Sequence, residues 1–128
     1  LGHIYYAQSK HSEANIEYRK AIELNPDDPV NKSYLAVSLS KSGNRQEVLK
    51  ILDELKTQSA RQFVPPMAFV NLYIALGEKD EAFAWMEKDF ENRSYISLYY
   101  TVLPIFNDLH NDPRFTDLVR RVELAKIN

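Results

Sequence analysis

Apolar positions in residues 1–26 form two stripes with helical spacing, joined by a short polar turn at residues 9–12. The first stripe contains Leu1, Ile4 and Tyr5, and the second contains Ala14, Tyr18, Ala21 and Ile22. Pro26 ends the second stripe because proline cannot continue a helix. The small residues Gly2, Ala14 and Ala21 mark where two helices approach closely. This pattern predicts a helical hairpin.

The same pattern returns twice at a spacing of 34 residues. The aligned positions are Leu1 with Leu35 and Phe69, Tyr5 with Leu39 and Tyr73, Ser9 with Gly43 and Gly77, and Tyr18 with Leu52 and Met86. One helical face therefore stays apolar three times. Glycine in the turn suits the left-handed position at a helix C-terminus.

The stripes and stop signals give approximate bounds for each helix. We expect helices at Leu1–Gln8, Ser12–Leu24, Val30–Ser42, Arg45–Gln58, Pro66–Leu76 and Lys79–Asn92, and a short one at Ser97–Val102. Asp28 and Asn31 are the cap candidates for the third helix, and Asp112 followed by Pro113 starts a closing helix. Its apolar stripe is Phe115, Leu118, Val119 and Val122. Asp89 is expected on the surface, paired with Arg93 one helical turn later.

These positions resemble the tetratricopeptide repeat (TPR), which has a Leu-Gly, Tyr, Ala, Phe/Tyr, Ala, Pro signature. The matching residues are Leu1, Gly2, Tyr5, Ala14, Tyr18, Ala21 and Pro26. The resemblance implies an all-α solenoid of helical hairpins, wound as a right-handed superhelix and closed by a C-terminal capping helix. It would be a single domain, with repeats at about 1–28, 29–62 and 63–96 and a cap at 97–128.

A second resemblance covers the C-terminal part of the chain. The runs LGEKDEAFAWMEKDFENRS and LPIFNDLHNDPRFTDLVRRVEL are similar to the closing segment of TPR regions in bacterial signalling and regulatory proteins. That resemblance implies a cytoplasmic setting and an upstream transcriptional regulator, kinase or cyclase. Because Leu1 falls inside the first expected helix, we expect the N-terminus to be truncated.

Composition and charge disfavour several kinds of partner and site. The net charge of −2 does not favour nucleic acid, and no apolar run reaches the ~18 residues that a membrane span needs. The chain has no cysteine, and its three histidines have no metal-site spacing. With three glycines it has no phosphate loop, and no nucleophile elbow is visible. We therefore expect no enzyme activity, catalytic residue, metal or cofactor.

In TPR proteins the leading helix of each hairpin lines a concave groove that holds a peptide or a partner's helix. The corresponding positions here are His3, Tyr6, Ala7, Val30, Ser33, Val37, Ser40, Lys41, Val64, Met67, Asn71 and Ile74. This lining is mostly neutral and apolar. A clamp for an acidic chaperone tail is disfavoured, because only Lys41 and Asn71 suit one. The alternative, that several of these residues pack on a neighbouring helix or on upstream structure, stays open.

The sequence thus predicts a non-catalytic scaffold that binds a protein or peptide partner in its groove. The alternative is a self-association module, a homodimer in which the first helix and the aromatic residues of Tyr95–Tyr100 bury against a second copy. If the groove prediction is right, Asn71→Ala with Met67→Glu abolishes binding and shifts the melting temperature little. A large melting shift would identify core positions instead.

Overall fold

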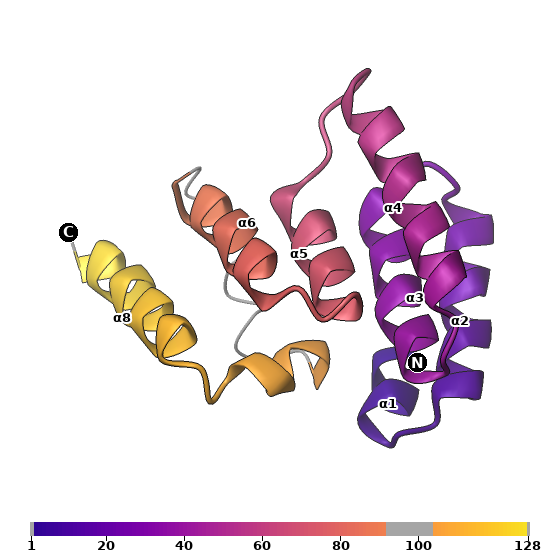
Figure 1. The fold of residues 1–128 in the computed structure, drawn as a ribbon, viewed down its shortest axis with the longest axis horizontal. Helices are drawn as coiled ribbons and strands as arrows, with labels where there is room; N and C mark the ends of the chain where they lie inside the picture. The colour runs from indigo at the N-terminus through magenta and orange to yellow at the C-terminus, as the bar shows by residue number, and fades with distance from the viewer. Residues whose placement is uncertain (1, 92–103, 128) are drawn as a thin grey trace.

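The fold was analysed in a computed structural model that describes residues 2–91 and 104–127. All regular structure in these ranges is helical (Figure 1). The elements are α1 (Gly2–Ala7), α2 (His11–Leu24), α3 (Pro29–Lys41), α4 (Arg45–Ser59), α5 (Pro66–Ala75), α6 (Lys79–Glu91), the 3-10 helix η2 (Pro104–Leu109) and α8 (Pro113–Ile127). From α1 to α6, each bound lies within one residue of the expected one. The helix expected at Ser97–Val102 lies outside the described residues.

The helices form three hairpins, α1 with α2, α3 with α4, and α5 with α6, which follow one another in chain order (Figure 1). The central helix α3 packs against α2, α4 and α5, so it joins the first hairpin to the third. Helix α8 packs against α6 at the far end of the row. This arrangement is the helical-repeat fold that the 34-residue period predicts.

The turn inside each hairpin closes in the same way three times. The backbone N–H of Lys10 donates to the carbonyl of Tyr5 at 2.9 Å, and the equivalent bonds join Asn44 to Leu39 and Glu78 to Tyr73. Such a bond closes a helix end only when the residue before the donor has a left-handed backbone. Gly43 and Gly77 have φ values of 83° and 76°, and Ser9 takes the same conformation with φ of 60°.

Helix starts follow the predicted caps. The Asp28 carboxylate accepts the backbone N–H of Val30 at 2.9 Å at the start of α3. Asp112 does the same for the N–H of Arg114 at 2.9 Å, and Pro113 is the first residue of α8. Both caps satisfy amide groups that have no partner within the helix.

Close helix packing in the first hairpin depends on Gly2. A Cβ atom built on Gly2 would lie 2.6 Å from Cε1 of Tyr18, so no larger residue fits between α1 and α2 without displacing the tyrosine ring. Ala14 is fully buried on α2. The expected role of a small residue at this contact is confirmed for Gly2, and the third expected position, Ala21, is half-buried.

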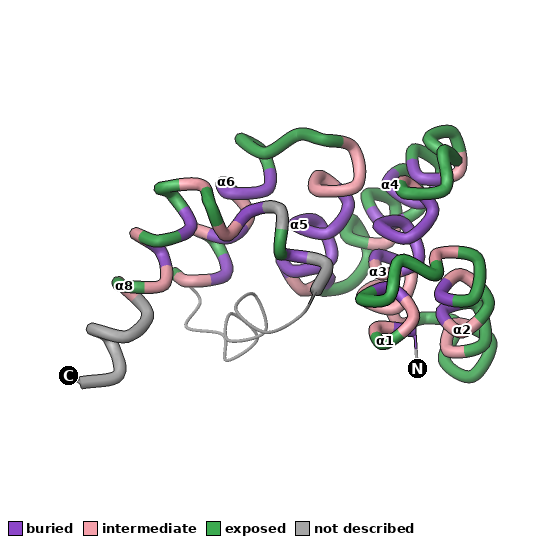
Figure 2. The backbone as a smooth tube through the Cα atoms, turned by 90° about the horizontal axis from the view of Figure 1, so that it is seen from below, coloured by how far each residue is buried: buried purple, intermediate pink, exposed green. Residues whose placement is uncertain are grey.

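A continuous hydrophobic core runs through the hairpins and into the C-terminal segment (Figure 2). Its fully buried large side chains include Leu39, Leu55, Leu72, Met86, Phe106 and Leu109. Asp89 on α6 is also fully buried, so its expected place on the surface is wrong. The 34-residue spacing aligns Asp89 with Ala21 and Leu55, and Leu55 is fully buried in the core as well. The expected partner Arg93 lies outside the described residues.

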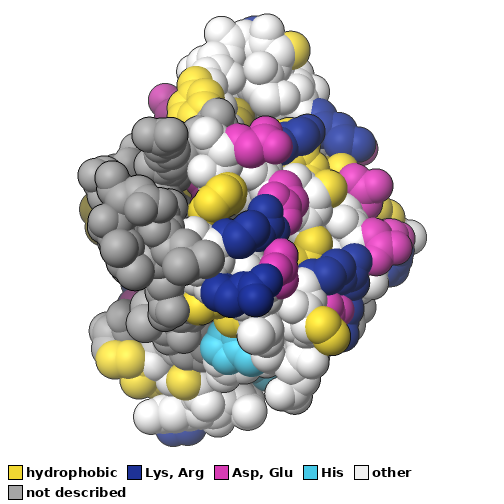
Figure 3. Space-filling view, turned by 90° about the vertical axis from the view of Figure 1, so that its left-hand side faces the viewer, with side chains coloured by type: hydrophobic (Ala, Val, Ile, Leu, Met, Phe, Trp, Pro, Cys, Tyr) yellow, Lys and Arg dark blue, Asp and Glu magenta, His cyan; other side chains and the backbone are white. Residues whose placement is uncertain are grey.

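The closing helix α8 buries Phe115 and Leu118, as its stripe predicts. The side chain of Val122 lies outside the described part. Arg114 Nη1 lies 2.6 Å from Asp80 Oδ1, and Arg121 pairs with Glu87, so two arginines of α8 bind acidic residues of α6. Figure 3 shows cationic and anionic side chains interleaved over this end of the molecule. Hydrogen bonds from Arg114 also lower the pKa of the Asp112 carboxyl group.

Candidate partner-binding groove

The candidate groove residues lie on the leading helices α1, α3 and α5 and on the segment that precedes α5, but most of them have no access to solvent. Tyr6, Ser33, Val37, Val64, Met67 and Asn71 are buried, His3, Val30, Ser40 and Ile74 are half-buried, and Ala7 and Lys41 are exposed. Val37 and Asn71 have 0% of their surface exposed and Met67 has 1%.

This burial corrects the expectation of an open groove at these positions. The lining of an open groove keeps some solvent access along its length, and the six buried side chains keep 9% or less. They are core positions, which is the alternative that the sequence left open. Whether the accessible residues on the same helices contact a partner stays a prediction.

A polar contact joins α5 to α3 within this core. The Asn71 side-chain amide donates to the Ser33 hydroxyl at 2.8 Å, and that hydroxyl donates to the Val30 carbonyl at 2.6 Å. Buried polar groups need such partners because an unpaired one loses its hydration without compensation. The contact fixes the register of the third hairpin against the second.

An aromatic cluster joins all three hairpins. The His3 ring meets Tyr34 edge-on, with 4.5 Å between the ring centroids, and His3 Nδ1 lies 2.8 Å from the Tyr18 hydroxyl. The Tyr34 hydroxyl reaches Met67 Sδ at 4.0 Å. Burial lowers the pKa of His3, so the neutral ring is favoured. Burial also raises the pKa of Tyr18, with a smaller contribution from the neighbouring tyrosines.

Tyr34 was not among the predicted site residues. It precedes Leu35 in the second hairpin, one place before the apolar stripe, and it aligns with Ala68 rather than with an aromatic residue. Aligning the repeats does not single out such a position, because no aromatic residue recurs there. Only its half-buried placement between His3 and Met67 identifies it.

The C-terminal segment reaches the first leading helix. Although η2 follows α6 in the chain, it packs against α1, and Figure 1 shows it between α8 and the first hairpin. Phe106 and Leu109 of η2 are 0% and 1% exposed and belong to the same core as Tyr6, Val37 and Met67. The α1 end of the leading-helix side is thus covered by the chain itself.

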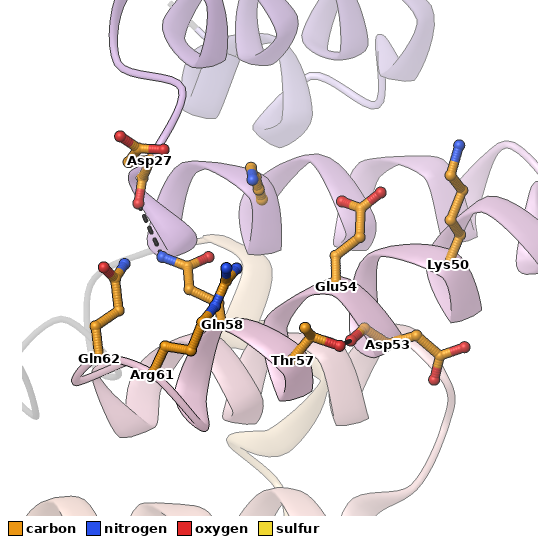
Figure 4. Close-up of a pocket in the computed structure, with 9 residues that line it drawn as sticks. Asp27, Lys50, Asp53, Glu54, Thr57, Gln58, Arg61 and Gln62 are labelled. Carbon is orange, nitrogen blue, oxygen red and sulfur yellow. Dashed lines mark hydrogen bonds between the residues drawn. The ribbon is translucent and has the colours of Figure 1, made fainter.

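An open cleft of about 700 Å³ lies away from this core, over α4 and the start of α3 (Figure 4). It is lined by Asp27, Lys32, Lys50, Asp53, Glu54, Thr57, Gln58, Arg61 and Gln62. The Thr57 hydroxyl donates to the Asp53 carbonyl at 3.0 Å and Gln58 donates to the Asp27 carbonyl at 3.1 Å, so both groups support the backbone. Balanced, exposed charges of this kind give no nucleophile and base at working distance.

Within the described part of the chain, no cluster of three or more metal-ligating side chains occurs. Over the same ranges, no helix combines the length and apolar character that crossing a membrane requires.

The stacked hairpins and their repeated turn define an all-α helical-repeat protein. Residues 1–28 match the family model described as tetratricopeptide repeat. The TPR repeat-containing thioredoxin TTL4 of Arabidopsis thaliana is 30% identical over 81 residues, which is 63% of this chain and 12% of that protein. No solved structure matches the chain. The family match covers the first hairpin, and the second and third hairpins repeat its helix–turn–helix architecture.

The chain spans 12% of the length of this relative. The word thioredoxin in that name describes the Arabidopsis protein. Tetratricopeptide repeats are generally protein–protein interaction modules, and the family is typically non-catalytic.

Proposed function

We propose that the chain is a non-catalytic module that binds a peptide or partner protein on the leading-helix side, through the predicted positions that stay accessible. These are Val30, Ser40, Lys41 and Ile74, with His3 and Ala7 on the first hairpin. The observation that carries the proposal is their position above a closed core. The buried hydrogen bond between Asn71 and Ser33 holds α5 against α3. These residues are therefore already in position before a partner binds.

The chemistry of these positions indicates the kind of partner. Val30 and Ile74 offer half-buried apolar surface, and Lys41 offers a positive charge near the opposite end of α3. Val30 and Lys41 are separated by about 16 Å along the helix, at 1.5 Å per residue. An extended peptide of about five residues covers that distance. A peptide with an apolar anchor at one end and a carboxylate at the other fits this surface.

Site-specific photo-crosslinking tests the proposal. We expect a photoreactive residue at Ser40 to capture the partner, because the α3 face carries the contact. The same residue at Lys56, which is exposed on the trailing helix α4, is the matched control and should capture none. Equal capture at both positions would contradict a leading-helix site.

We further propose a cytoplasmic setting within a larger bacterial signalling protein. The support is the similarity of the C-terminal runs to the closing segment of such proteins. The upstream regulator, kinase or cyclase would supply any catalysis.

A second candidate, self-association, is favoured by exposed apolar residues on the first hairpin. Ile4 on α1 and Ile16 on α2 are 56% and 54% exposed. The aromatic residues of Tyr95–Tyr100, also predicted for this contact, lie outside the described residues. Sedimentation over a wide concentration series separates the candidates, because a monomer throughout would exclude self-association.

A further inference from the structure

The 3-10 helix η2 carries two buried side chains three residues apart. Phe106 and Leu109 are 0% and 1% exposed, whereas Asn107 between them is exposed. A 3-10 helix has three residues per turn, so positions i and i+3 lie on the same face. A single helical turn therefore presents one phenylalanine and one leucine to the core.

The surface that receives this turn includes α1, the leading helix of the first hairpin. The two elements are distant in sequence, so their contact is tertiary and forms only when the C-terminal segment folds back over the hairpins. In a helical repeat, this is the side on which partner segments dock. η2 thus lies where a bound helical turn would lie.

The described remainder of the C-terminal segment is joined to α6 partly through exposed ion pairs. The side chains of Arg114 and Asp80 are 46% and 93% exposed, and exposed ion pairs of this kind stabilise a fold only weakly because solvent screens them. Phe115 and Leu118 supply the apolar part of the α6 contact. Release of η2 from α1 therefore exposes Phe106 and Leu109 together with the core side chains that they cover.

We infer that the α1 end of the leading-helix side is a docking site for a helical turn with the pattern Phe-x-x-Leu, and that η2 fills it within the same chain. A partner segment with a large aromatic residue and a leucine at i and i+3 competes with η2 for this site. The inference rests on the proposed binding function and names the class of partner segment. Binding from outside then requires displacement of the chain's own C-terminal segment.

A peptide titration tests the inference. The probe is a fluorescein-labelled peptide with the sequence of residues 104–112, titrated by anisotropy against the full chain and against the full-chain Phe106→Ala/Leu109→Ala variant. We expect the variant to bind at least about tenfold more tightly, because its site is no longer filled. Full-chain Asn107→Ala is the matched control and should bind like the unaltered chain. A peptide with alanine at both anchor positions should bind none of the three.

Hydrogen exchange on the unaltered chain gives an independent readout if the double variant does not fold. We expect the amides of η2 to exchange at least about tenfold faster than those of the central turns of α3, because a docked turn opens locally. Equal exchange rates, or a folded double variant without saturable peptide binding, would overturn the inference. Peptide binding that persists while crosslinking at Ser40 fails would instead reject the proposed partner surface and retain the η2 site.

Discussion

The turn inside each hairpin needs one residue with a left-handed backbone, and the first hairpin uses a serine. Ser9 has φ of 60°, where Gly43 and Gly77 stand in the later hairpins. A side chain makes that conformation unfavourable, whereas glycine adopts it without a clash. Exchanging serine and glycine-type residues between these turns therefore tests the backbone effect, and a substitution in one turn is the control for a substitution in another.

We expect Ser9→Gly to raise the free energy of unfolding by about 0.5 to 1 kcal/mol, measured by urea denaturation. Gly43→Ala should lower it by about 1 kcal/mol through the backbone alone, because a Cβ atom at Gly43 meets nothing within 4 Å. A loss of stability in Ser9→Gly would mean that the serine hydroxyl matters more than the backbone.

His3 links stability to pH. Burial lowers its pKa below the usual 6.5, so the unfolded chain binds a proton more readily than the folded chain does. The stabilisation from the neutral ring is present above pH 6.5 and is lost as the pH falls below that value. Urea denaturation over a pH series should show a smaller decrease for His3→Gln than for the unaltered chain. Identical pH dependence in the two proteins would exclude this role.

Helix α3, which belongs to the second hairpin, packs against helices of the first and third hairpins as well. Its N-terminus has a side-chain cap. Asp28→Ala should cost about 1 kcal/mol, because the backbone amides of Val30 and Asn31 lose their acceptor. The neighbouring Asp27→Ala is the control, since Asp27 takes part in the Gln58 contact through its backbone carbonyl. Thermal unfolding of the two variants checks the difference. Equal melting temperatures would argue against the cap.

The packing of α5 on α3 overturns an expectation from the sequence. Met67 and Asn71 are core residues, so Met67→Glu should destabilise the fold by about 3 kcal/mol or more, because it buries an unpaired carboxylate. Asn71→Ala should cost about 1 kcal/mol through loss of the Ser33 contact. Melting temperatures test both. Small shifts in both variants would restore the open groove that the repeat register predicts.

The helices could be predicted because each carries local signals. The 34-residue spacing, the apolar stripes and the Gly43 and Gly77 turns all act within one hairpin or between adjacent hairpins. The state of the groove could not be predicted in this way. It depends on how closely α5 packs on α3 and on the contact of η2 with α1, and no periodic signal links Phe106 to the first hairpin. The burial of Asp89 shows the same limit, because its charge suggested the surface while its register placed it in the core.

At the scale of the whole molecule, the hairpins and the C-terminal segment share one core. In a helical-repeat array, the side formed by the leading helices is usually an exposed binding surface. Here the described part of the C-terminal segment covers the α1 end of that side. Val37 is closed to solvent, while Lys41, further along the same helix, is open.

Thiol labelling measures this directly, because the chain has no cysteine of its own. Single Val37→Cys and Lys41→Cys variants would be mixed with a thiol reagent and the labelling rates compared under native conditions. We expect Cys at position 37 to react at least about 100-fold more slowly than Cys at position 41, since its exposure requires opening of the core. Comparable labelling rates at the two positions would show that position 37 is open to solvent in the folded chain.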